Sequence, residues 1–558
     1  MKIQHLVLAT LLAVSHLTTP LFAQTGTAGS RGPCGNGNNG GGGGGGGDNT
    51  NTPPGDEGDP VIPYTGNEFK MVDDLQIWGA VGNYPMVWSR HSNSRAVPGA
   101  SLFGTAHYWR HSFQWELSAT SKDASGRARM TLVFPDGATF TYTEVAPNLW
   151  SIGGTSADFL KRTDSGFVLQ TKDSYRYNFK VFPSGTSFYY LLTEVLDPSG
   201  NRFALEYDSS RRLVSVREPG GRFFQVSYST LTGNKLTPAT LATLGSKPAS
   251  GSWIDLPVTN NGTYRYVRVV QADGSFGNIA EIEVYEAGTN TKLSGSVICS
   301  DSLAQGTKAM DGDPTTSFQS TSYSGGFVGI KLPAGKKIGR VRILPAAGTE
   351  NLHKPTNGGY AALKVEGSNE ASVSATAISK VETSDGRAVN YSYTNIVDPT
   401  LPYVFPALTS VIFGDGSKSE YRLTRVFPGT RPLISEWDDV RYALRQGRYK
   451  TVYQSNQTGA VLGAVYAQVN LETGKEILRI GLKSNNLHQP MVTFANGGNV
   501  VQYYGANKPG ANAITRRDDA NGNPTIYTFD ATTGYTATEK DPLGRITAYA
   551  WTDKGQMA

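Results

Sequence analysis

The sequence predicts an all-β fold, and three of its features lead to that prediction. Glycine is abundant, at 65 of 558 residues, and aromatic residues make up 10% of the chain. This composition favours short strands joined by many turns. Short segments of alternating apolar and polar residues follow one another from about residue 59. Asp-Gly, Asn-Gly and Pro-x-Gly turns separate these segments, whereas long helical periodicity is hard to find.

The first 23 residues have the pattern of a signal peptide. Lys2 supplies the positive start, Leu6–Val14 is a short apolar run, and Ala23 is a small residue at a suitable cleavage point. This apolar run of nine residues is too short to span a bilayer, and no later run is long enough. We therefore expect a secreted or periplasmic protein, or one at the cell surface, with no transmembrane segment.

Residues 24–60 read as a disordered linker rich in Gly and Asn, in which Gly40–Gly47 is a run of glycine alone. Cys34 lies in this linker, and an exported protein with two cysteines invites a disulfide with Cys299. Holding so flexible a segment in place costs conformational entropy, so the pairing stays open. The net charge of +5 is small for this length and forms no basic stripe, so no nucleic-acid partner is expected.

Hairpins begin at about residue 61. Thr131–Tyr142 is a strand, a Pro-Asp-Gly turn and a second strand, and Leu408–Leu423 has the same pattern around Gly-Asp-Gly. In such turns glycine supplies the positive φ that a tight bend requires.

One hairpin unit recurs at a nearly fixed period. Leu196–Asp208 has three later copies, which are Val381–Tyr393, Asp518–Asp530 and Lys540–Gln556. The step from Gly200 to Gly221 is 21 residues, and the step from Gly522 to Gly544 is 22. Recurring Asp, Gly and Arg are what a turn needs, whereas a catalytic site would occur once. We therefore interpret these segments as structural repeats.

The repeat resembles that of the RHS/YD-repeat family, whose units read D-x-x-G-R/N, then Tyr/Phe-x-Tyr-Asp, then G-R-L. The matching residues are Asp197, Gly200, Tyr207, Asp208, Arg212 and Leu213. Arg211 departs from the pattern, because the family prefers Gly there. Val72–Arg95 and Phe103–Leu117 are similar to the family's leading segment. The resemblance implies a spiralling β-sheet that closes into a shell, formed by residues 61–230 and 377–558 and ending partway through a repeat.

Residues 231–376 interrupt the repeat and carry another set of motifs. In chain order these are Tyr264–Glu286, Lys308–Ser320, Gly325–Pro345 and Leu363–Glu370. They resemble the discoidin-like, or coagulation-factor C-type, galactose-binding family, with its hallmarks N-I-A-E-I-E, A-x-D-G-D-x-x-T and E-G-S-N. The resemblance implies an inserted jelly-roll β-sandwich of eight strands, of the kind used as a lectin module.

The insert offers a candidate calcium site. Asp311, Asp313 and Thr316 bring oxygen atoms together within six residues, and calcium takes roughly six to eight oxygen ligands. The resemblance implies a structural Ca²⁺ at this turn, with Glu366 of the closing strand as a further ligand. The alternative is an Asx-turn that holds no ion.

The insert also offers candidate residues for carbohydrate binding. A lectin surface needs an aromatic ring to stack on the sugar and planar hydrogen-bonding groups for its hydroxyls. Residues of these types in its predicted loops are Trp253, Tyr323, Phe327, Asn351, His353 and Tyr360. Each of them is alternatively an ordinary packing or loop-surface residue.

The sequence contains no identifiable catalytic constellation. His107 and His111 are four residues apart, but their segment reads as a strand and lacks the Glu of H-E-x-x-H. Zinc needs a third ligand, and the sequence pattern does not indicate which residue that would be. Nucleophile-elbow and phosphate-loop motifs are absent. We therefore predict a protein that is not an enzyme.

Three functional hypotheses follow. The favoured one is an exported YD-repeat scaffold whose insert binds a glycan or cell-surface ligand, with further RHS shell segments as additional partners. The first alternative is the leading shell portion of a polymorphic toxin or effector whose toxic domain lies downstream. The second is a polysaccharide-degrading enzyme with an accessory lectin module.

Overall fold

The computed structural model is all-β, as the sequence predicts, and the residues it describes contain a single short helix, α1 (Leu303–Thr307). It describes residues 61–551 except for the internal stretches 63–66, 95–101, 106–108, 153–157, 172, 185–186, 246–250, 272–277, 321–325, 348–354, 357–358, 361–362, 399–400, 425–431, 439–447, 454–464, 483–489, 495–496, 509–510 and 531–534. Within these described parts, no helical segment has the length and hydropathy of a membrane span. The predicted signal peptide and linker, residues 1–60, lie outside the described residues.

The first strands form an N-terminal sheet in the order β1-β2-β3-β4. They are β1 (Val61–Ile62), β2 (Asn67–Gln76), β3 (Val87–Asn93) and β4 (Trp109–His111). Every residue of β3 is buried, including Arg90 and His91. A strand enclosed in this way must find partners for its polar side chains inside the protein.

Antiparallel hairpins of the predicted kind form a long wall. Its first part consists of β5 (Glu116–Thr120), β6 (Arg129–Val133), β7 (Thr139–Ala146), β8 (Leu149–Ser151), β9 (Phe159–Thr163), β10 (Gly166–Gln170), β11 (Arg176–Ser184), β12 (Ser187–Leu196), β13 (Arg202–Tyr207), β14 (Leu213–Arg217) and β15 (Phe223–Leu244). The hairpin predicted within Thr131–Tyr142 is β6 and β7. Each strand pairs with the next, and β12 also pairs with β5, so that β5 to β12 close into a ring.

The second part of the wall continues after the insert. Its strands are β25 (Ala388–Val397), β26 (Val404–Ile412), β27 (Lys418–Thr424), β28 (Leu433–Asp438), β29 (Arg448–Tyr453), β30 (Val465–Asn470), β31 (Glu476–Leu482), β32 (Pro490–Phe494), β33 (Asn499–Lys508), β34 (Ala511–Asp518), β35 (Pro524–Phe529), β36 (Thr536–Lys540) and β37 (Ile546–Ala548). The hairpin predicted within Leu408–Leu423 is β26 and β27.

An acidic residue organises the repeat turns at Gly200, Arg211, Gly522 and Gly544. Asp197 Oδ1 accepts hydrogen bonds from the backbone N–H groups of Ser199 and Asn201, at 2.9 and 2.8 Å. Asp208, Asp519 and Asp541 bind their turns in the same way. Gly200 takes a φ of 83°, and Arg211, at the equivalent position of the next turn, takes a φ of 65°. Arg211 therefore carries a side chain in the left-handed region, where glycine is favoured.

The tyrosine of a repeat donates a hydrogen bond to the neighbouring strand where the ladder has a bulge. The ladder skips Val214, because Tyr207 pairs with Leu213 and Glu206 pairs with Ser215. Such a bulge disrupts the local pairing, and the Tyr228 hydroxyl donates to the carbonyl oxygen of Leu213 at 2.7 Å. Tyr207, Tyr393 and Trp551 make the same contact, 15 residues back, with the carbonyls of Leu192, Ile378 and Thr536. An aromatic donor recurs at this place because a buried carbonyl without a partner is costly.

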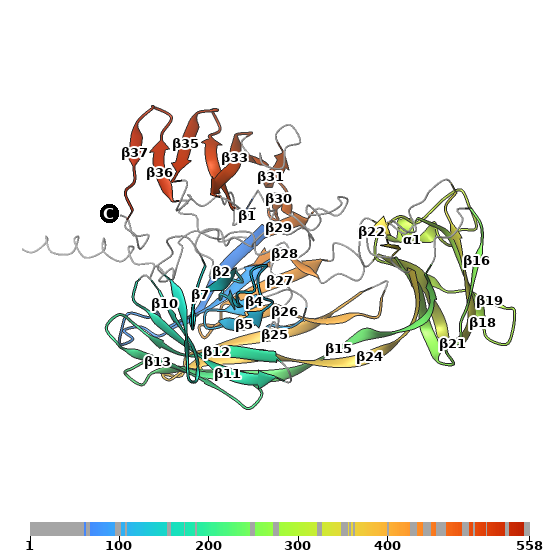
Figure 1. Cartoon of the computed structure of the whole chain (residues 1–558), viewed down its shortest axis with the longest axis horizontal. Coiled ribbons are helices and arrows are strands. Elements are labelled where there is room, and N and C mark those ends of the chain that lie inside the picture. Colours follow the sequence, from blue (N-terminus) through green and yellow to red (C-terminus); the bar gives the residue numbers. More distant parts are fainter. Residues whose placement is uncertain are drawn as a thin grey trace, which may run out of the picture.

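A two-stranded ribbon connects the wall to the inserted unit. β15 and β24 (Leu363–Thr383) form one antiparallel pair that runs from Phe224 opposite Thr383 to Leu244 opposite Leu363, with two register shifts along it. The predicted limits of the insert fall inside this ribbon, where Thr230 pairs with Thr376. Figure 1 shows the inserted unit at the far end of the ribbon, away from the wall.

The inserted unit has two main sheets around a core of its own. Its other elements are β16 (Ile254–Pro257), β17 (Thr263–Val270), β18 (Ile279–Glu286), β19 (Lys292–Leu293), β20 (Ser296–Cys299), α1, β21 (Phe327–Pro345), β22 (Pro355–Thr356) and β23 (Gly359–Tyr360). The first sheet contains β24, β17, β20 and the start of β21; the second contains β16, β18, β19 and the end of β21; and β22 and β23 pair separately. Val267 and Ile330 of the first sheet share one cluster with Ile282 and Val341 of the second. The unit is therefore a β-sandwich.

The main core joins the N-terminal sheet to both parts of the wall. Trp88 and Trp109 of the sheet lie in one cluster with Phe203 and Phe224, from before the insert, and Trp437, from after it. All five side chains are buried.

Buried charges of the N-terminal sheet bind wall strands that are far away in the sequence. Arg90 Nε donates to Asp74 at 2.5 Å, and the Tyr391 hydroxyl donates to the same carboxylate at 2.7 Å, across 317 positions. Lys70 Nζ donates to the Tyr449 hydroxyl at 2.9 Å, across 379 positions. These side chains are all buried, and removing one partner of a buried ion pair is strongly destabilising. We call the contacts of Lys70, Asp74 and Arg90 with these wall strands the seam. The seam therefore fixes β2 and β3 against β25 and β29.

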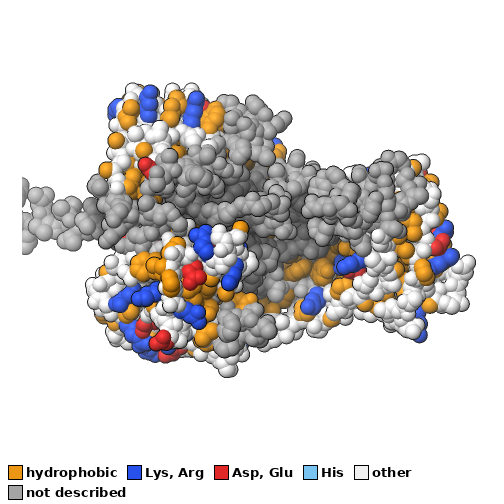
Figure 2. Space-filling view, viewed as in Figure 1, with side chains coloured by type: hydrophobic (Ala, Val, Ile, Leu, Met, Phe, Trp, Pro, Cys, Tyr) orange, Lys and Arg blue, Asp and Glu red, His pale blue; other side chains and the backbone are white. Residues whose placement is uncertain are grey.

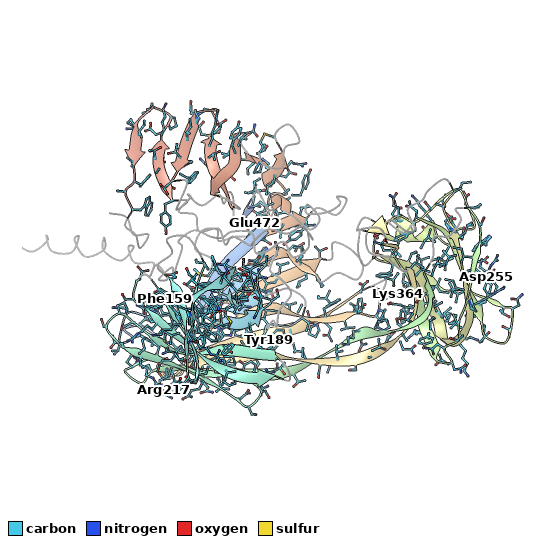
Figure 3. All side chains as sticks on the ribbon, viewed as in Figure 1. Phe159, Tyr189, Arg217, Asp255, Lys364 and Glu472 are labelled. Carbon is cyan, nitrogen blue, oxygen red and sulfur yellow. The ribbon has the colours of Figure 1, made fainter. Side chains whose placement is uncertain are left out.

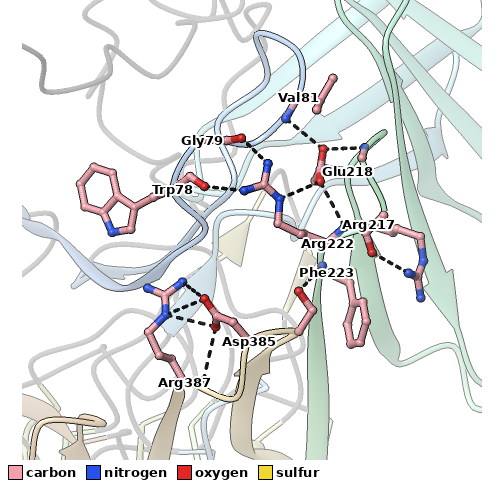
Figure 4. Close-up of polar contacts among 12 residues, drawn as sticks. Trp78, Gly79, Val81, Arg217, Glu218, Arg222, Phe223, Asp385 and Arg387 are labelled. Carbon is pink, nitrogen blue, oxygen red and sulfur yellow. Dashed lines mark hydrogen bonds and ion pairs between the residues drawn. The ribbon is translucent and has the colours of Figure 1, made fainter.

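The loop after β2 is clamped onto the turns of the wall, as Figure 4 shows for part of the contact. Arg222 donates to two backbone carbonyl oxygens of the loop. Glu218 accepts from the backbone N–H of Val81 at 3.0 Å, and Asp197 accepts from that of Asn83 at 2.8 Å. The repeat turns are thus structural, and two of them also hold the N-terminal sheet in place.

Candidate functional site

Oxygen atoms gather at the turn after α1. The Thr316 hydroxyl lies 2.8 Å from Asp311 Oδ2 and 3.3 Å from the carbonyl oxygens of Lys308 and Asp313. The predicted ligands Asp311, Asp313 and Thr316 therefore lie together. No three His, Cys, Asp or Glu side chains meet within the part of the chain that the structure describes. A calcium ion here would therefore rely on backbone and hydroxyl oxygens as well as carboxylates, as calcium sites often do.

Glu281 of β18 is a further acidic group at this turn, and the sequence analysis did not single it out. Its side chain is only 5% exposed, and its Oε1 has no hydrogen-bond partner among the described residues. Burial raises the pKa of Glu281, and the negative charge of Asp311 adds to the rise. Two neighbouring carboxylates, one of them buried, are stabilised by a cation. The residues present therefore fit calcium, which takes hard oxygen ligands.

Glu366 lies elsewhere, which corrects its assignment to this turn. It belongs to β24 of the first sheet, whereas Glu281 belongs to the second. Arg268 Nε and Nη2 donate to Glu366 Oε2 at 2.9 and 2.8 Å. The motif order placed Glu366 in a closing strand, but the sheet that this strand joins depends on pairing with distant segments.

The structure describes the side chains of two of the predicted sugar-binding residues. Trp253 directly precedes β16 and is 37% exposed, and the Arg342 guanidinium lies 4.5 Å from its ring centroid. The prediction that Phe327 lies in a loop is wrong, because Phe327 begins β21 and is only 6% exposed. It packs in a cluster that includes Tyr266 and Leu401. Trp253 therefore remains a candidate, and Phe327 has a packing role.

The side chains of the other predicted sugar-binding residues lie outside the part of the chain that the structure describes. Tyr323, Asn351 and His353 lie outside the described residues. Tyr360 lies in β23, but its side chain is outside the described part as well.

The histidines and cysteines do not add a site among the described residues. His107 lies outside them, and His111 is stacked on Trp88 with ring centroids 4.6 Å apart. Burial lowers the pKa of His111 well below its usual range, so a neutral packing role follows. Cys299 is buried and not in a disulfide, and burial raises its pKa to about 11. Cys34 lies outside the described residues.

Comparisons with known proteins give a family match for part of the chain. A family model described as a domain of unknown function (DUF6531) matches residues 58–142, which include the N-terminal sheet and the first wall strands. No curated protein matches the chain.

Three solved structures of Tc toxin proteins are weakly similar to the chain. A TcdB2-TccC3-Cdc42 structure is 10% identical, with a TM-score of 0.23 over 82% of this chain and 19% of the other. A TcdB2-TccC3 structure is 11% identical, with a TM-score of 0.21 over 84% and 20%. The Tc holotoxin pore of Photorhabdus luminescens is 10% identical, with a TM-score of 0.18 over 82% and 23%. The chain spans about a fifth of the length of these structures, and likenesses at this level carry no functional argument.

Proposed function

We propose that the chain is an exported, non-enzymatic scaffold of the RHS/YD-repeat type. Its inserted sandwich is then a discoidin-like module that binds a glycan or another cell-surface ligand. The observation that carries the proposal is the ribbon of β15 and β24, at whose far end a unit with its own core is held. In this division of roles the wall supplies rigidity and the module supplies recognition.

The module has a fixed position at the end of the ribbon. Leu401, from the segment between β25 and β26, packs with Tyr266 and Phe327 on the outside of the module's first sheet. Asn234 of the ribbon also pairs with Val404. Among the described residues these contacts involve the ribbon and the first sheet and not the second sheet.

A glycan array read with two forms of the chain tests the proposal. In the variant, an Asn-Gly turn replaces residues 236–370, between Lys235 and Ala371, which face each other in the ribbon. We expect the full chain to bind a subset of glycans and the variant to bind none, with the same β-sheet circular dichroism from the wall. Equal binding by both forms, or no glycan bound by the full chain with calcium present, contradicts the proposal.

We also propose that the turn at Asp311 binds a structural Ca²⁺, with Glu281 in place of Glu366 as the additional acidic ligand. Binding to the folded state alone raises stability, by about 2.7 kcal/mol at a hundredfold excess over Kd. We expect calcium to raise the melting temperature of the full chain and chelation to reverse the rise. Glu281→Gln should abolish the response, whereas the matched variant Glu366→Gln should keep it. Loss of the response in the Glu366 variant alone would overturn the assignment.

The pH dependence of stability gives a second test of the calcium site. The folded-state pKa of Glu281 is raised above its ordinary value of 4.5. Its protonated form is therefore favoured by folding, and this contribution is present below pH 4.5 and lost as the pH rises through the raised pKa. Without calcium, stability should fall over that pH interval, and the fall should be absent in Glu281→Gln. Saturating calcium should cancel it in the unmodified chain.

A further inference from the structure

One face of the module carries an ordered array of aromatic and charged side chains. We define this distal face by Trp253, Asp255, Glu283, Tyr285, Arg340 and Arg342. The strand residues among them alternate with core residues such as Ile282 and Val341, so they point to the outside of the sandwich. Figure 3 shows Asp255 at the end of the molecule remote from the wall, and Figure 2 shows charged and hydrophobic side chains side by side at that end.

Trp253 is the exposed ring of the distal face, and its surroundings hold it in place. The Arg342 guanidinium lies 4.5 Å from its ring centroid. Arg342 is itself fixed, because its Nη1 donates to Glu283 at 2.9 Å and its Nε lies 3.2 Å from Asp255 Oδ1. The ring is therefore positioned by a guanidinium that two carboxylates position in turn, and it remains 37% exposed. A side chain ordered before binding loses little entropy when a ligand stacks on it.

A second aromatic–guanidinium pair lies in the neighbouring row. Tyr285 and Arg340 are directly opposite each other in the β18–β21 pairing, and the guanidinium lies 4.2 Å from the ring centroid. The Tyr285 hydroxyl donates to Glu283 at 2.8 Å, which links this pair to the first one. Arg340 Nη2 donates to Asn290 at 2.8 Å. The two rows thus form one connected network.

The charges of the distal face favour a neutral ligand. Arg340 and Arg342 pair with Asp255 and Glu283, and Lys292 also pairs with Glu283, so every one of these five groups is in an ion pair. The Asp255 side chain is 53% exposed, so it would oppose an anionic ligand while offering acceptor oxygens to hydroxyls. An exposed ring beside planar donors and acceptors suits a saccharide, which has an apolar side and a hydroxylated rim.

We propose that the distal face binds a neutral saccharide, with Trp253 stacked on the sugar and with Asp255 and Arg340 bonded to its hydroxyls. This inference rests on the proposed function, because it names the ligand class and the residues of the module's binding site. Ligand recognition then lies on a sheet face of the module, and the oxygen-rich turn at Asp311 has a structural role.

Titration of the full chain against immobilised neutral and uronate-containing oligosaccharides tests the inference. We expect binding to neutral glycans, weakened about tenfold or more by Trp253→Ala and less by Trp253→Phe, which keeps a ring. Arg342→Lys should also weaken binding, because lysine cannot form the planar stack with Trp253. The matched control is Trp78→Ala, which removes a 70% exposed tryptophan from the wall side of the chain and should change nothing.

The outcomes separate this inference from the proposed function. If the full chain binds glycans and Trp253→Ala binds them equally well, the distal face is not the site, although the module still is a binding module. Binding confined to uronate-containing glycans overturns the ligand class. Failure of the full chain to bind any glycan overturns the proposed function and this inference together. An unchanged calcium response in Trp253→Ala would show that the variant module is folded.

Discussion

The repeats beside the N-terminal sheet and those at the end of the wall share their local structure but not their burial. Asp197 and Asp541 bind their turns through the same pair of backbone N–H contacts. Tyr228 and Trp551 both donate to a carbonyl 15 residues earlier. The turn contacts and the aromatic hydrogen bond therefore form in both regions, whether or not another sheet covers the strands.

The inward positions of the two regions differ. Phe203 and Phe224, six residues after the acidic turn residues Asp197 and Glu218, are fully buried in the main core. The position six residues after Asp541 is Thr547, and all three residues of β37 are exposed. Local contacts thus make a strand, whereas burial depends on the N-terminal sheet that covers the first region. Differences in stability between the regions should follow from this covering.

Truncation of a covered aromatic should have the largest effect. Phe203→Ala leaves a cavity between the wall and the N-terminal sheet, so we expect a loss of about 3–5 kcal/mol in the free energy of unfolding. Thr547→Ala, at the equivalent uncovered position, should change it by less than about 0.5 kcal/mol. Urea denaturation measures both. Similar losses at the two positions would remove the distinction between the regions.

The seam should show the next largest effect. Asp74→Asn keeps the size of the side chain but removes the negative charge that pairs with the buried Arg90, at a cost of about 3 kcal/mol. Asp541→Asn affects a carboxylate whose partner Arg545 is largely exposed, so it should lower the urea midpoint far less. The expected readout is the urea midpoint, with hydrogen exchange of β2 and β3 increased only in the Asp74 variant. Equal midpoints for the two variants would argue against the seam.

The tyrosine contact can be removed in one repeat and added in another. Tyr228→Phe leaves the Leu213 carbonyl without its donor and should cost about 1–2 kcal/mol. Phe529 stands 15 residues after Ile514, next to a ladder shift of the same kind, but it has no hydroxyl. Phe529→Tyr should therefore stabilise the chain by about 0.5–1 kcal/mol. Thermal denaturation should move in opposite directions for the two variants, and a shift of equal sign would contradict the proposed contact.

The smallest effect concerns the turn at Arg211. A residue other than glycine at a φ of 65° is strained, so Arg211→Gly should stabilise the chain by about 0.5 kcal/mol after the entropy cost of glycine. Arg202→Gly, in the regular strand β13, should destabilise it by a similar amount. Melting temperatures of the two variants test the difference. A loss of stability in Arg211→Gly would mean that the side chain contributes contacts that outweigh the strain.

Part of the candidate site was predictable and part was not. Asp311, Asp313 and Thr316 are close in the sequence, so a single turn brings them together. Glu281 and Glu366 both lie in motif segments of the insert, and only strand pairing decides which of them lies beside Asp311. Phe327 is predicted to lie in a loop, but pairing with Val270 of β17 makes it a strand residue.

The hairpins, their turns and the aromatic donors follow from local sequence, because each of these contacts joins residues within about 15 positions of each other. The contact of β2 and β3 with strands more than 300 residues away, and that of Trp253 with Arg342, depend on how distant segments pack. The physical reason is that alternation and turn chemistry act along the chain. The partner of a buried charge or ring is instead set by whichever distant segment packs against it.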